Sequence, residues 1–259
     1  MSVRLAVVGA GGRMGSAVLR LAGERGMTVV RAIGRTGARE DTAVLSLGVK
    51  LETDVDVLAS GGFDVAIDFS SVDAFPRVLR GVVASGAALV SGTTGLSAEA
   101  LCALDEAARH VPVLWEPNLS VGVHVLGKLL HQAIAALGDG FDVEIVEAHH
   151  KNKVDAPSGT AVRLAQIARE AGAGPDLRHG REGRPGARTK AEIGVHAVRG
   201  GDVVGDHSIH LLGLGERLEL VHRATNRDVF AHGALRAAAW LVGRAAGRYT
   251  LANVLEPEP

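Results

Sequence analysis

The segment between Glu147 and Ala161 carries the densest group of side chains that could do chemistry. Two histidines and two lysines precede a Ser-Gly-Thr sequence, and these residues are His149, His150, Lys151, Lys153, Ser158, Gly159 and Thr160. Imidazoles can accept or give a proton near neutral pH, and a lysine adds a full positive charge. The Ser-Gly-Thr sequence can begin a helix whose first N–H groups favour an anion. We therefore expect proton transfer beside a bound dicarboxylate or phosphate; the alternative is a solvated basic loop before a capped helix.

A glycine-rich loop near the N-terminus is the second candidate. It runs from Val7 to Gly15 and contains Gly9, Ala10, Gly11, Gly12, Arg13 and Met14. Because Met14 occupies a glycine position, the spacing is G-x-x-G-x-x-G rather than G-x-G-x-x-G. Such a loop between a strand and a helix lets the backbone approach a pyrophosphate closely. We predict dinucleotide binding here, with a tight turn that binds nothing as the alternative.

The residues after the second predicted strand should select the cofactor. An acidic side chain there binds the 2′-hydroxyl of NAD, whereas an arginine accommodates the 2′-phosphate of NADP. This chain has Gly34 followed by Arg35, with Arg39 nearby. We therefore predict a preference for NADPH, with NADH still possible. The alternative is that Arg35 is a solvated loop charge.

Other candidate residues carry less chemistry. His207 and His210 are three apart on a predicted strand, so they should point to opposite faces and make a poor metal pair. The single cysteine, Cys102, excludes a multi-cysteine metal site and is expected to pack on a helix. We therefore expect no bound metal.

The elements that position these residues begin with an alternation of strands and helices. Short apolar runs predict strands at Val3–Val8, Thr28–Ile33, Phe63–Asp68, Ala87–Val90 and Val111–Trp115. Helical patterns lie between them at Gly12–Arg25, Val72–Ala84 and, with Ser97 as the N-cap, up to Arg109. This alternation predicts an α/β fold with a doubly wound, parallel, Rossmann-like sheet.

The middle of the chain has a different pattern. A long apolar helix at Val121–Leu137 precedes a strand at Asp142–Glu147, a helix at Ala161–Ala171 and a Gly-, Pro- and Arg-rich loop over residues 171–190. Three alternating segments then predict an antiparallel meander at Glu192–Arg199, Val203–Leu212 and Arg217–Ala224. A final helix is predicted at Asp228–Ala246.

These patterns predict two domains. Residues 1–120 with 229–259 form the expected dinucleotide-binding domain, and residues 121–228 form a smaller α+β domain, with a mostly antiparallel sheet, for substrate binding and oligomerisation. Of the 259 residues, 47% are hydrophobic and 22% are charged, which is typical of a globular protein. The net charge of −1 argues against nucleic-acid binding, and no apolar run reaches the roughly 18 residues of a membrane span. We expect a cytoplasmic protein with neither nucleic-acid nor membrane partners.

The sequence resembles the 4-hydroxy-tetrahydrodipicolinate reductase family, also called dihydrodipicolinate reductases. The matching segments cover nearly the whole chain in order, and they are Val8–Gly15, Ile67–Ser70, Ser91–Gly95, Pro117–Val123, Glu147–Ala161 and Arg199–His207. The resemblance implies NAD(P)H-dependent reduction of 4-hydroxy-tetrahydrodipicolinate to tetrahydrodipicolinate, with loss of water, in the diaminopimelate route to lysine. It also implies a homotetramer built through the sheet of the second domain.

The resemblance further implies roles for individual residues. Residues Gly9 to Met14 would hold the pyrophosphate, and the residues near the nicotinamide ribose would be Gly92, Thr93, Thr94, Pro117, Asn118 and Leu119. His149 would exchange the proton, His150 would bind substrate, and Lys153 would donate a proton and pair with substrate charge. Gly159 and Thr160, with Ser158 before them, would bind a substrate carboxylate. Whether His149 or Lys153 delivers the proton stays open.

Two departures from the family pattern concern the cofactor. Gly34 stands where family members often carry Glu, so the expected ribose carboxylate is missing. Ser71 stands where members that bind the 2′-phosphate often have a second basic residue. The first departure disfavours NADH, and the second reduces the expected selectivity for NADPH.

Two other functions are alternatives to the reductase. One is a nicotinamide-dependent dehydrogenase of another amino-acid-derived imine. This alternative is disfavoured by the combination of Lys153 with Ser158, Gly159 and Thr160. The other is a non-catalytic NAD(P)-binding sensor, which would have no use for a proton donor beside a carboxylate site.

Overall fold

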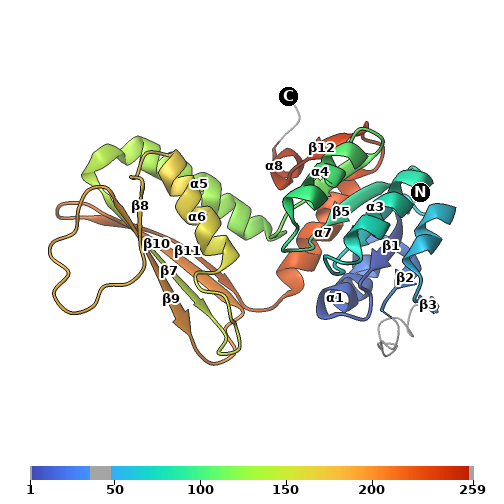
Figure 1. Ribbon diagram of the computed structural model, residues 1–259, viewed down its shortest axis with the longest axis horizontal. Helices are drawn as coiled ribbons and strands as arrows, with labels where there is room; N and C mark the ends of the chain where they lie inside the picture. The colour runs from blue at the N-terminus through green and yellow to red at the C-terminus, as the bar shows by residue number, and fades with distance from the viewer. Residues whose placement is uncertain (1, 36–47, 257–259) are drawn as a thin grey trace. The chain divides into compact units, whose positions relative to one another are not determined.

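The computed structural model describes residues 2–35 and 48–256, and the chain divides into two compact units (Figure 1). One unit comprises Met1–Val121 and Arg227–Pro259, and the other comprises Gly122–Asn226. Each unit has its own sheet and its own apolar core. The second unit is thus an insertion into the chain of the first.

The first unit is built on a seven-stranded sheet whose paired strands are all parallel, as the sequence predicts. Its order is β12-β6-β5-β4-β1-β2-β3. The strands are β1 (Arg4–Val8), β2 (Thr28–Ile33), β3 (Leu51–Glu52), β4 (Val65–Asp68), β5 (Ala88–Ser91), β6 (Pro112–Trp115) and β12 (Gly247–Tyr249). The strand order reverses at β1, and the carboxyl ends of all strands lie at one edge, where α/β folds of this type bind their ligands.

Helices cover both faces of this sheet. They are α1 (Arg13–Ala22), α3 (Phe75–Ser85), α4 (Ala98–Ala107), α7 (Asp228–Leu241) and α8 (Leu251–Leu255), with 3-10 turns at Gly23–Arg25 and Val55–Ser60. Leu5 and Val7 of β1 enter a core with α1 and α7, whereas Ala6 and Val8 enter a core with α3 and α4. Strand β1 is therefore apolar throughout because it is buried on both faces.

The last long helix ends earlier than the sequence predicts. Helix α7 stops at Leu241 rather than Ala246, because Val242 is extended and Gly243 adopts a left-handed conformation with φ +78°. Strand β12 and helix α8 follow, and the sequence pattern misses both. The Glu116 carboxylate accepts a hydrogen bond from the Leu251 N–H, which ties the start of α8 to the segment after β6.

The second unit is built on a five-stranded mixed sheet in the order β11-β10-β7-β9-β8. The strands are β7 (Asp142–His149), β8 (Asp176–Arg178), β9 (Glu192–Arg199), β10 (Gly205–Leu212) and β11 (Arg217–Ala224). The predicted meander is confirmed for β10 and β11, which pair antiparallel, but it is wrong for β9, because β7 lies between β9 and β10 and pairs with β9 in parallel. Strand β8 also lies within the expected loop of residues 171–190. The central strand β7 ends at His149 and so carries this histidine directly.

Helices α5 (Val121–Leu137) and α6 (Gly159–Glu170) cover one face of the mixed sheet, sharing a core with β7, β9 and β10 (Figure 1). With the 3-10 turn that follows it, α5 forms one helical segment, Val121–Gly140, of 20 residues. An 18-residue window of this segment has a mean hydropathy of 1.3, so the segment is long and apolar enough to cross a membrane by length and composition alone, which is weak evidence for a span. A core helix of a soluble protein passes the same test.

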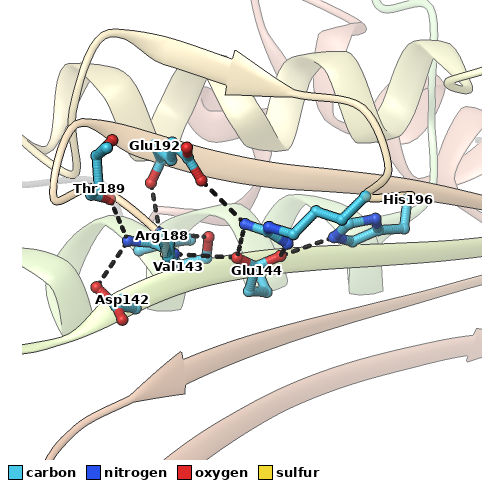
Figure 2. A network of polar contacts seen from close by, with 8 residues as sticks. Asp142, Val143, Glu144, Arg188, Thr189, Glu192 and His196 are labelled. Carbon is cyan, nitrogen blue, oxygen red and sulfur yellow. Dashed lines mark hydrogen bonds and ion pairs between the residues drawn. The ribbon is translucent and has the colours of Figure 1, made fainter. Parts of the chain in front are cut away.

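The opposite face of the sheet carries a cluster of ion pairs around Glu144 of β7 (Figure 2). Its carboxylate accepts from Arg181 at 2.7 and 3.0 Å and from Arg188 at 3.1 Å, and it lies 2.7 Å from His196 Nε2. Gly194 lies opposite Glu144 in β9, where a Cβ would come within 1.8 Å of the carboxylate. Burial raises the pKa of Glu144, but the basic partners outweigh it and lower the pKa to about 2. The two arginines precede β9, so the cluster fastens the preceding loop to the sheet.

We predict that this cluster makes the folded chain sensitive to acid. A carboxyl group whose pKa falls on folding stabilises the protein fully above its usual pKa of 4.5, and this contribution is lost as the pH drops toward about 2. Glu144→Gln should lower the free energy of unfolding at neutral pH by about 3 kcal/mol and flatten that acid-dependent loss. Urea unfolding at several pH values measures both effects.

Glu106→Gln is the matched control, because Glu106 pairs with Arg109 at the exposed surface of α4. Exposed pairs of this kind contribute about 0 to 1 kcal/mol. Equal free energies of unfolding for the two variants would contradict a stabilising role for the Glu144 cluster.

Candidate active site

The glycine-rich loop joins β1 to α1 at the carboxyl edge of the parallel sheet. The N–H groups of Gly9 and Ala10 donate to the Ile33 carbonyl at 2.8 and 2.9 Å, and the Gly12 N–H donates to the Gly9 carbonyl at 2.9 Å. Gly9 has φ +82°, and a Cβ there would come within 2.4 Å of the Phe69 carbonyl oxygen. Glycine is therefore required at position 9 both for the left-handed conformation and for the close approach.

The first turn of α1 fits an anion. Gly11, Gly12 and Arg13 are exposed, and no side chain caps the helix at Gly12. A Cβ on Gly15 would come within 2.2 Å of the Gly9 carbonyl oxygen, so the helix approaches the loop closely. The uncapped first turn and the helix dipole suit the pyrophosphate of a dinucleotide.

The end of β2 presents a positive side chain. Arg35 is exposed directly after Gly34, whose N–H donates to the Glu52 carbonyl at 2.8 Å. Strand β3 brings Glu52 beside β2, but the Glu52 carboxylate pairs with Arg31 at 3.0 Å. Arg39 lies outside the described residues. The positive charge of Arg35 therefore lies at the end of β2, where the Glu52 carboxylate is already paired with Arg31.

A buried carboxylate shapes the loop after β5. Asp68 is fully buried and accepts from the hydroxyls of Ser91 and Thr93, each at 2.8 Å. The Trp115 indole N–H donates to the Thr93 carbonyl at 2.8 Å. These bonds fix the conformation of the loop with Gly92 and Thr94. This role of Asp68 is not predicted from the sequence, although a carboxylate that ends an apolar strand is a recognisable signal.

Pro117, Asn118 and Leu119 follow β6 at the same edge. The Asn118 side-chain carbonyl accepts from the Ser120 N–H at 2.9 Å, and Leu119 is buried. A Cβ on Gly233 of α7 would meet the Leu119 carbonyl oxygen at 1.7 Å, so this segment lies directly on the helix. The structure thus brings the predicted cofactor residues into loops that follow β1, β2, β5 and β6.

The reactive segment of the second unit lies between β7 and α6. Ser158 caps α6 as predicted, because its Oγ accepts from the Ala161 N–H at 3.2 Å. Since Ser158 is the N-cap, the helix begins at Gly159, two residues earlier than predicted. Gly159 and Thr160 therefore form the start of α6, where N–H groups have no acceptor within the helix and suit a carboxylate.

Glu147 lies at the centre of this segment and is fully buried. One of its oxygens lies 2.6 Å from His149 Nδ1, the other accepts from the Ser158 N–H at 3.0 Å, and Arg199 of β9 donates to both oxygens at 2.7 Å. Burial raises the pKa of Glu147, but the bonds from Arg199, His149 and Ser158 outweigh it and hold the pKa below its usual value. This role of Glu147 is not predicted from the sequence, although a spacing of two on a strand places Glu147 on the face of His149.

His207 of β10 also belongs to this group. It is buried, its ring meets the His149 ring edge-on with centroids 5.3 Å apart, and its Nε2 lies 3.4 Å from the Ser158 Oγ. Burial and the neighbouring His149 lower the pKa of His207 to about 4, so it is neutral near pH 7. The sequence pattern indicates for His207 only a poor metal ligand and does not predict its place beside His149.

The remaining predicted substrate residues lie on the turn after β7. Lys153 Nζ pairs with Asp155 at 2.7 Å, with 21% of the lysine side chain exposed. The Lys153 N–H donates to the His150 carbonyl at 3.0 Å, and among the described residues the buried His150 Nδ1 finds no hydrogen-bond partner. The second unit therefore places the Lys153 ammonium group and the imidazoles of His149 and His150 on the segment that leads to the N-terminus of α6.

Two minor predictions have separate outcomes. Cys102 is exposed on α4 rather than packed against apolar neighbours, because its side chain lies on the solvent face of that helix. His210 lies 3.3 Å from Glu219 on the other face of the sheet from His207. Within residues 2–35 and 48–256, no group of three or more His, Cys, Asp or Glu side chains is placed to hold a metal ion.

Comparison with known proteins agrees with both halves of the chain. Residues 3–119 match the family described as "Dihydrodipicolinate reductase, N-terminus", and residues 122–255 match "Dihydrodipicolinate reductase, C-terminus". The chain is 48% identical over 263 residues to the 4-hydroxy-tetrahydrodipicolinate reductase of Anaeromyxobacter dehalogenans strain 2CP-1, with 97% of each chain covered. It is 47% identical to the enzyme of the same name from Myxococcus xanthus, covering 98% of this chain and 97% of that one.

A solved structure of similar fold carries the same family name. It is the dipicolinate-bound dihydrodipicolinate reductase from Paenisporosarcina sp. TG-14, with a TM-score of 0.76, 25% identity, and coverage of 98% of this chain and 100% of that chain. An amine dehydrogenase from Mycobacterium smegmatis shares the fold at a TM-score of 0.61 and 14% identity, covering 97% of this chain and 95% of its own. From these matches over both units, the chain belongs to the dihydrodipicolinate reductase family.

Proposed function

We propose that this chain reduces 4-hydroxy-tetrahydrodipicolinate to tetrahydrodipicolinate with NAD(P)H and loss of water, in the diaminopimelate route to lysine. The observation that carries this function is the end of β7 with the turn after it, where His149 and Lys153 precede the capped start of α6. The glycine-rich loop between β1 and α1, which suits a pyrophosphate, supports the same function. The first unit serves as the dinucleotide-binding domain and the second as the substrate-binding domain of a cytoplasmic enzyme.

The segment after β7 suits a cyclic imine that carries two carboxylates. Lys153 and the first N–H groups of α6 bind one carboxylate, and Lys153 turns from Asp155 to the substrate. The half-buried His150 contributes a second polar contact. The cofactor, held by residues Gly9 to Met14 and by the loops at Gly92 and Asn118, supplies a hydride when bound. Reduction leaves negative charge on the conjugated imine, and His149 or Lys153 neutralises it by giving a proton.

We predict that replacing His149 or Lys153 abolishes most turnover without loss of folding. His149→Gln should lower kcat by about 100-fold or more, which is the usual contribution of general acid catalysis. Lys153→Ala should lower kcat and also raise KM for the substrate, because the carboxylate loses its charged partner. The measurement is NADPH oxidation on adding the condensate of aspartate semialdehyde and pyruvate, made in situ.

Lys151→Ala is the matched control, because Lys151 is exposed on the same turn. Unchanged turnover in both His149→Gln and Lys153→Ala would refute the catalytic assignment. A wild-type chain that binds NADPH but oxidises none of it would favour another imine substrate or the sensor function.

The cofactor preference is proposed from the charge at the end of β2. Arg35→Ala should raise KM for NADPH about tenfold and leave KM for NADH unchanged, because only the 2′-phosphate makes a charged contact worth about 1.5 kcal/mol or more. Arg109→Ala, at an exposed arginine just after α4, is the control. Steady-state kinetics with both cofactors decide this, and an equal rise for NADH would show that Arg35 does not read the phosphate.

We further propose a homotetramer assembled through the helix-free face of the mixed sheet. This face exposes the apolar residues Val198, Leu212 and Val221, with exposed fractions of 51%, 36% and 41%. Apolar patches of this kind mark association surfaces. Sedimentation of the wild type should give four copies, and Val221→Lys should give smaller species. A monomeric wild type would contradict the assembly.

A further inference from the structure

The bonding of the Glu147 carboxylate carries an inference that deepens the proposed function and rests on it. We propose that Glu147 is a positioning residue, which holds a proton on His149 Nδ1 and leaves His149 Nε2 as the atom that exchanges a proton with the substrate. Arg199 supports it by keeping the Glu147 carboxylate ionised. Neither Glu147 nor Arg199 is among the residues proposed to bind the cofactor, bind the substrate or transfer the proton.

The hydrogen bond to His149 fixes where the imidazole carries its proton. His149 Nδ1 lies 2.6 Å from Glu147 Oε2, and Glu147 is fully buried. An ionised carboxylate can only accept a hydrogen bond, so Nδ1 must donate. A neutral His149 therefore has a bare Nε2, and a protonated His149 has its second N–H there. Either way, Nε2 is the atom available to a substrate.

Arg199 keeps the proton from moving on to Glu147. Its two Nη atoms each lie 2.7 Å from a Glu147 oxygen, in a two-pronged pair, and one of them also donates to the Asp155 carbonyl at 2.7 Å. Such charge-assisted pairs stabilise the ionised carboxylate. Glu147 thus orients the His149 imidazole and keeps its own negative charge without becoming protonated, as the carboxylate of a Ser-His-Asp triad does.

On the side that faces β10, no side chain from Gly205 contacts His149 Nε2. A Cβ on Gly205 of β10 would come within 3.1 Å of His149 Nε2, so the glycine keeps that side clear. His207, the other ring against His149, is neutral near pH 7 and adds no competing charge. In the reaction, Nε2–H gives its proton to the reduced substrate, the N–H electron pair stays on Nε2, and His149 regains a proton from water.

The test compares Glu147→Gln with Glu144→Gln. Both variants remove a carboxylate of β7 that is paired with arginine, but Glu144 lies on the opposite face and touches no residue of the site. In the wild type, the Ser158 N–H and one Arg199 nitrogen both donate to Glu147 Oε1. In Glu147→Gln, the amide oxygen must take this position to accept both bonds, so the amide nitrogen points toward His149. That amide donates to Nδ1 and shifts the imidazole proton to Nε2.

Two readouts are needed, namely steady-state kinetics and nitrogen NMR of protein labelled at histidine nitrogens, with the His149 signals assigned from the His149→Gln variant. We expect kcat of Glu147→Gln to fall about 100-fold with KM for the substrate little changed, whereas Glu144→Gln keeps the wild-type kcat. The spectra should show neutral His149 protonated on Nδ1 in the wild type and in Glu144→Gln, but on Nε2 in Glu147→Gln.

Three results would overturn the proposal. They are a wild-type His149 protonated on Nε2, the same tautomer in all variants, and equal kcat values for Glu147→Gln and Glu144→Gln. A merely structural role for Glu147 would lower stability and raise KM without switching the tautomer. If the wild type shows no reductase turnover, the proposed function fails separately, and the spectra alone support or overturn the placement of the proton.

Discussion

The pairing of one buried carboxylate is the constraint on which the site of the second unit depends. Glu147 has no access to water, and an ionised group there is tolerated only when its oxygens are hydrogen-bonded and its charge is balanced. Its partners come from three places, namely His149 on β7, Arg199 on β9 and the Ser158 N–H before α6. Because the same bonds orient an imidazole and place a helix N-terminus, stability and chemistry depend on one network.

The first unit uses the same principle at its cofactor edge. Asp68 is buried at the end of β4, and its hydrogen bonds to Ser91 and Thr93 hold the loop that follows β5. Two glycines allow close backbone contacts where a side chain would collide. Gly9 lies against the Phe69 carbonyl, and Gly15 of α1 lies against the Gly9 carbonyl. The parallel sheet supplies the common edge, and these buried contacts give each loop one conformation.

Local signals in the sequence are sufficient for the longer strands and helices and for the N-caps at Ser97 and Ser158, but not for the short elements β3, β8, β12 and α8. The strand–helix alternation predicts the parallel sheet, and Ser158 predicts the start of α6, because both depend on residues close in sequence. Pairing between distant strands is not encoded locally, so the position of β7 between β9 and β10 was missed. The partnership of Glu147 with Arg199 joins residues 52 apart and was also missed, since only the assembled sheet brings them together.

The measurement that tests the central claim most directly follows the hydrogen that is transferred. The wild-type chain would be given NADPH carrying deuterium at both C4 positions of the nicotinamide, together with freshly made 4-hydroxy-tetrahydrodipicolinate. The account predicts tetrahydrodipicolinate with one deuterium on a ring carbon, detected by mass spectrometry and NMR. NADPH oxidation without deuterium in that product, or no oxidation by a folded chain that binds NADPH, would contradict it.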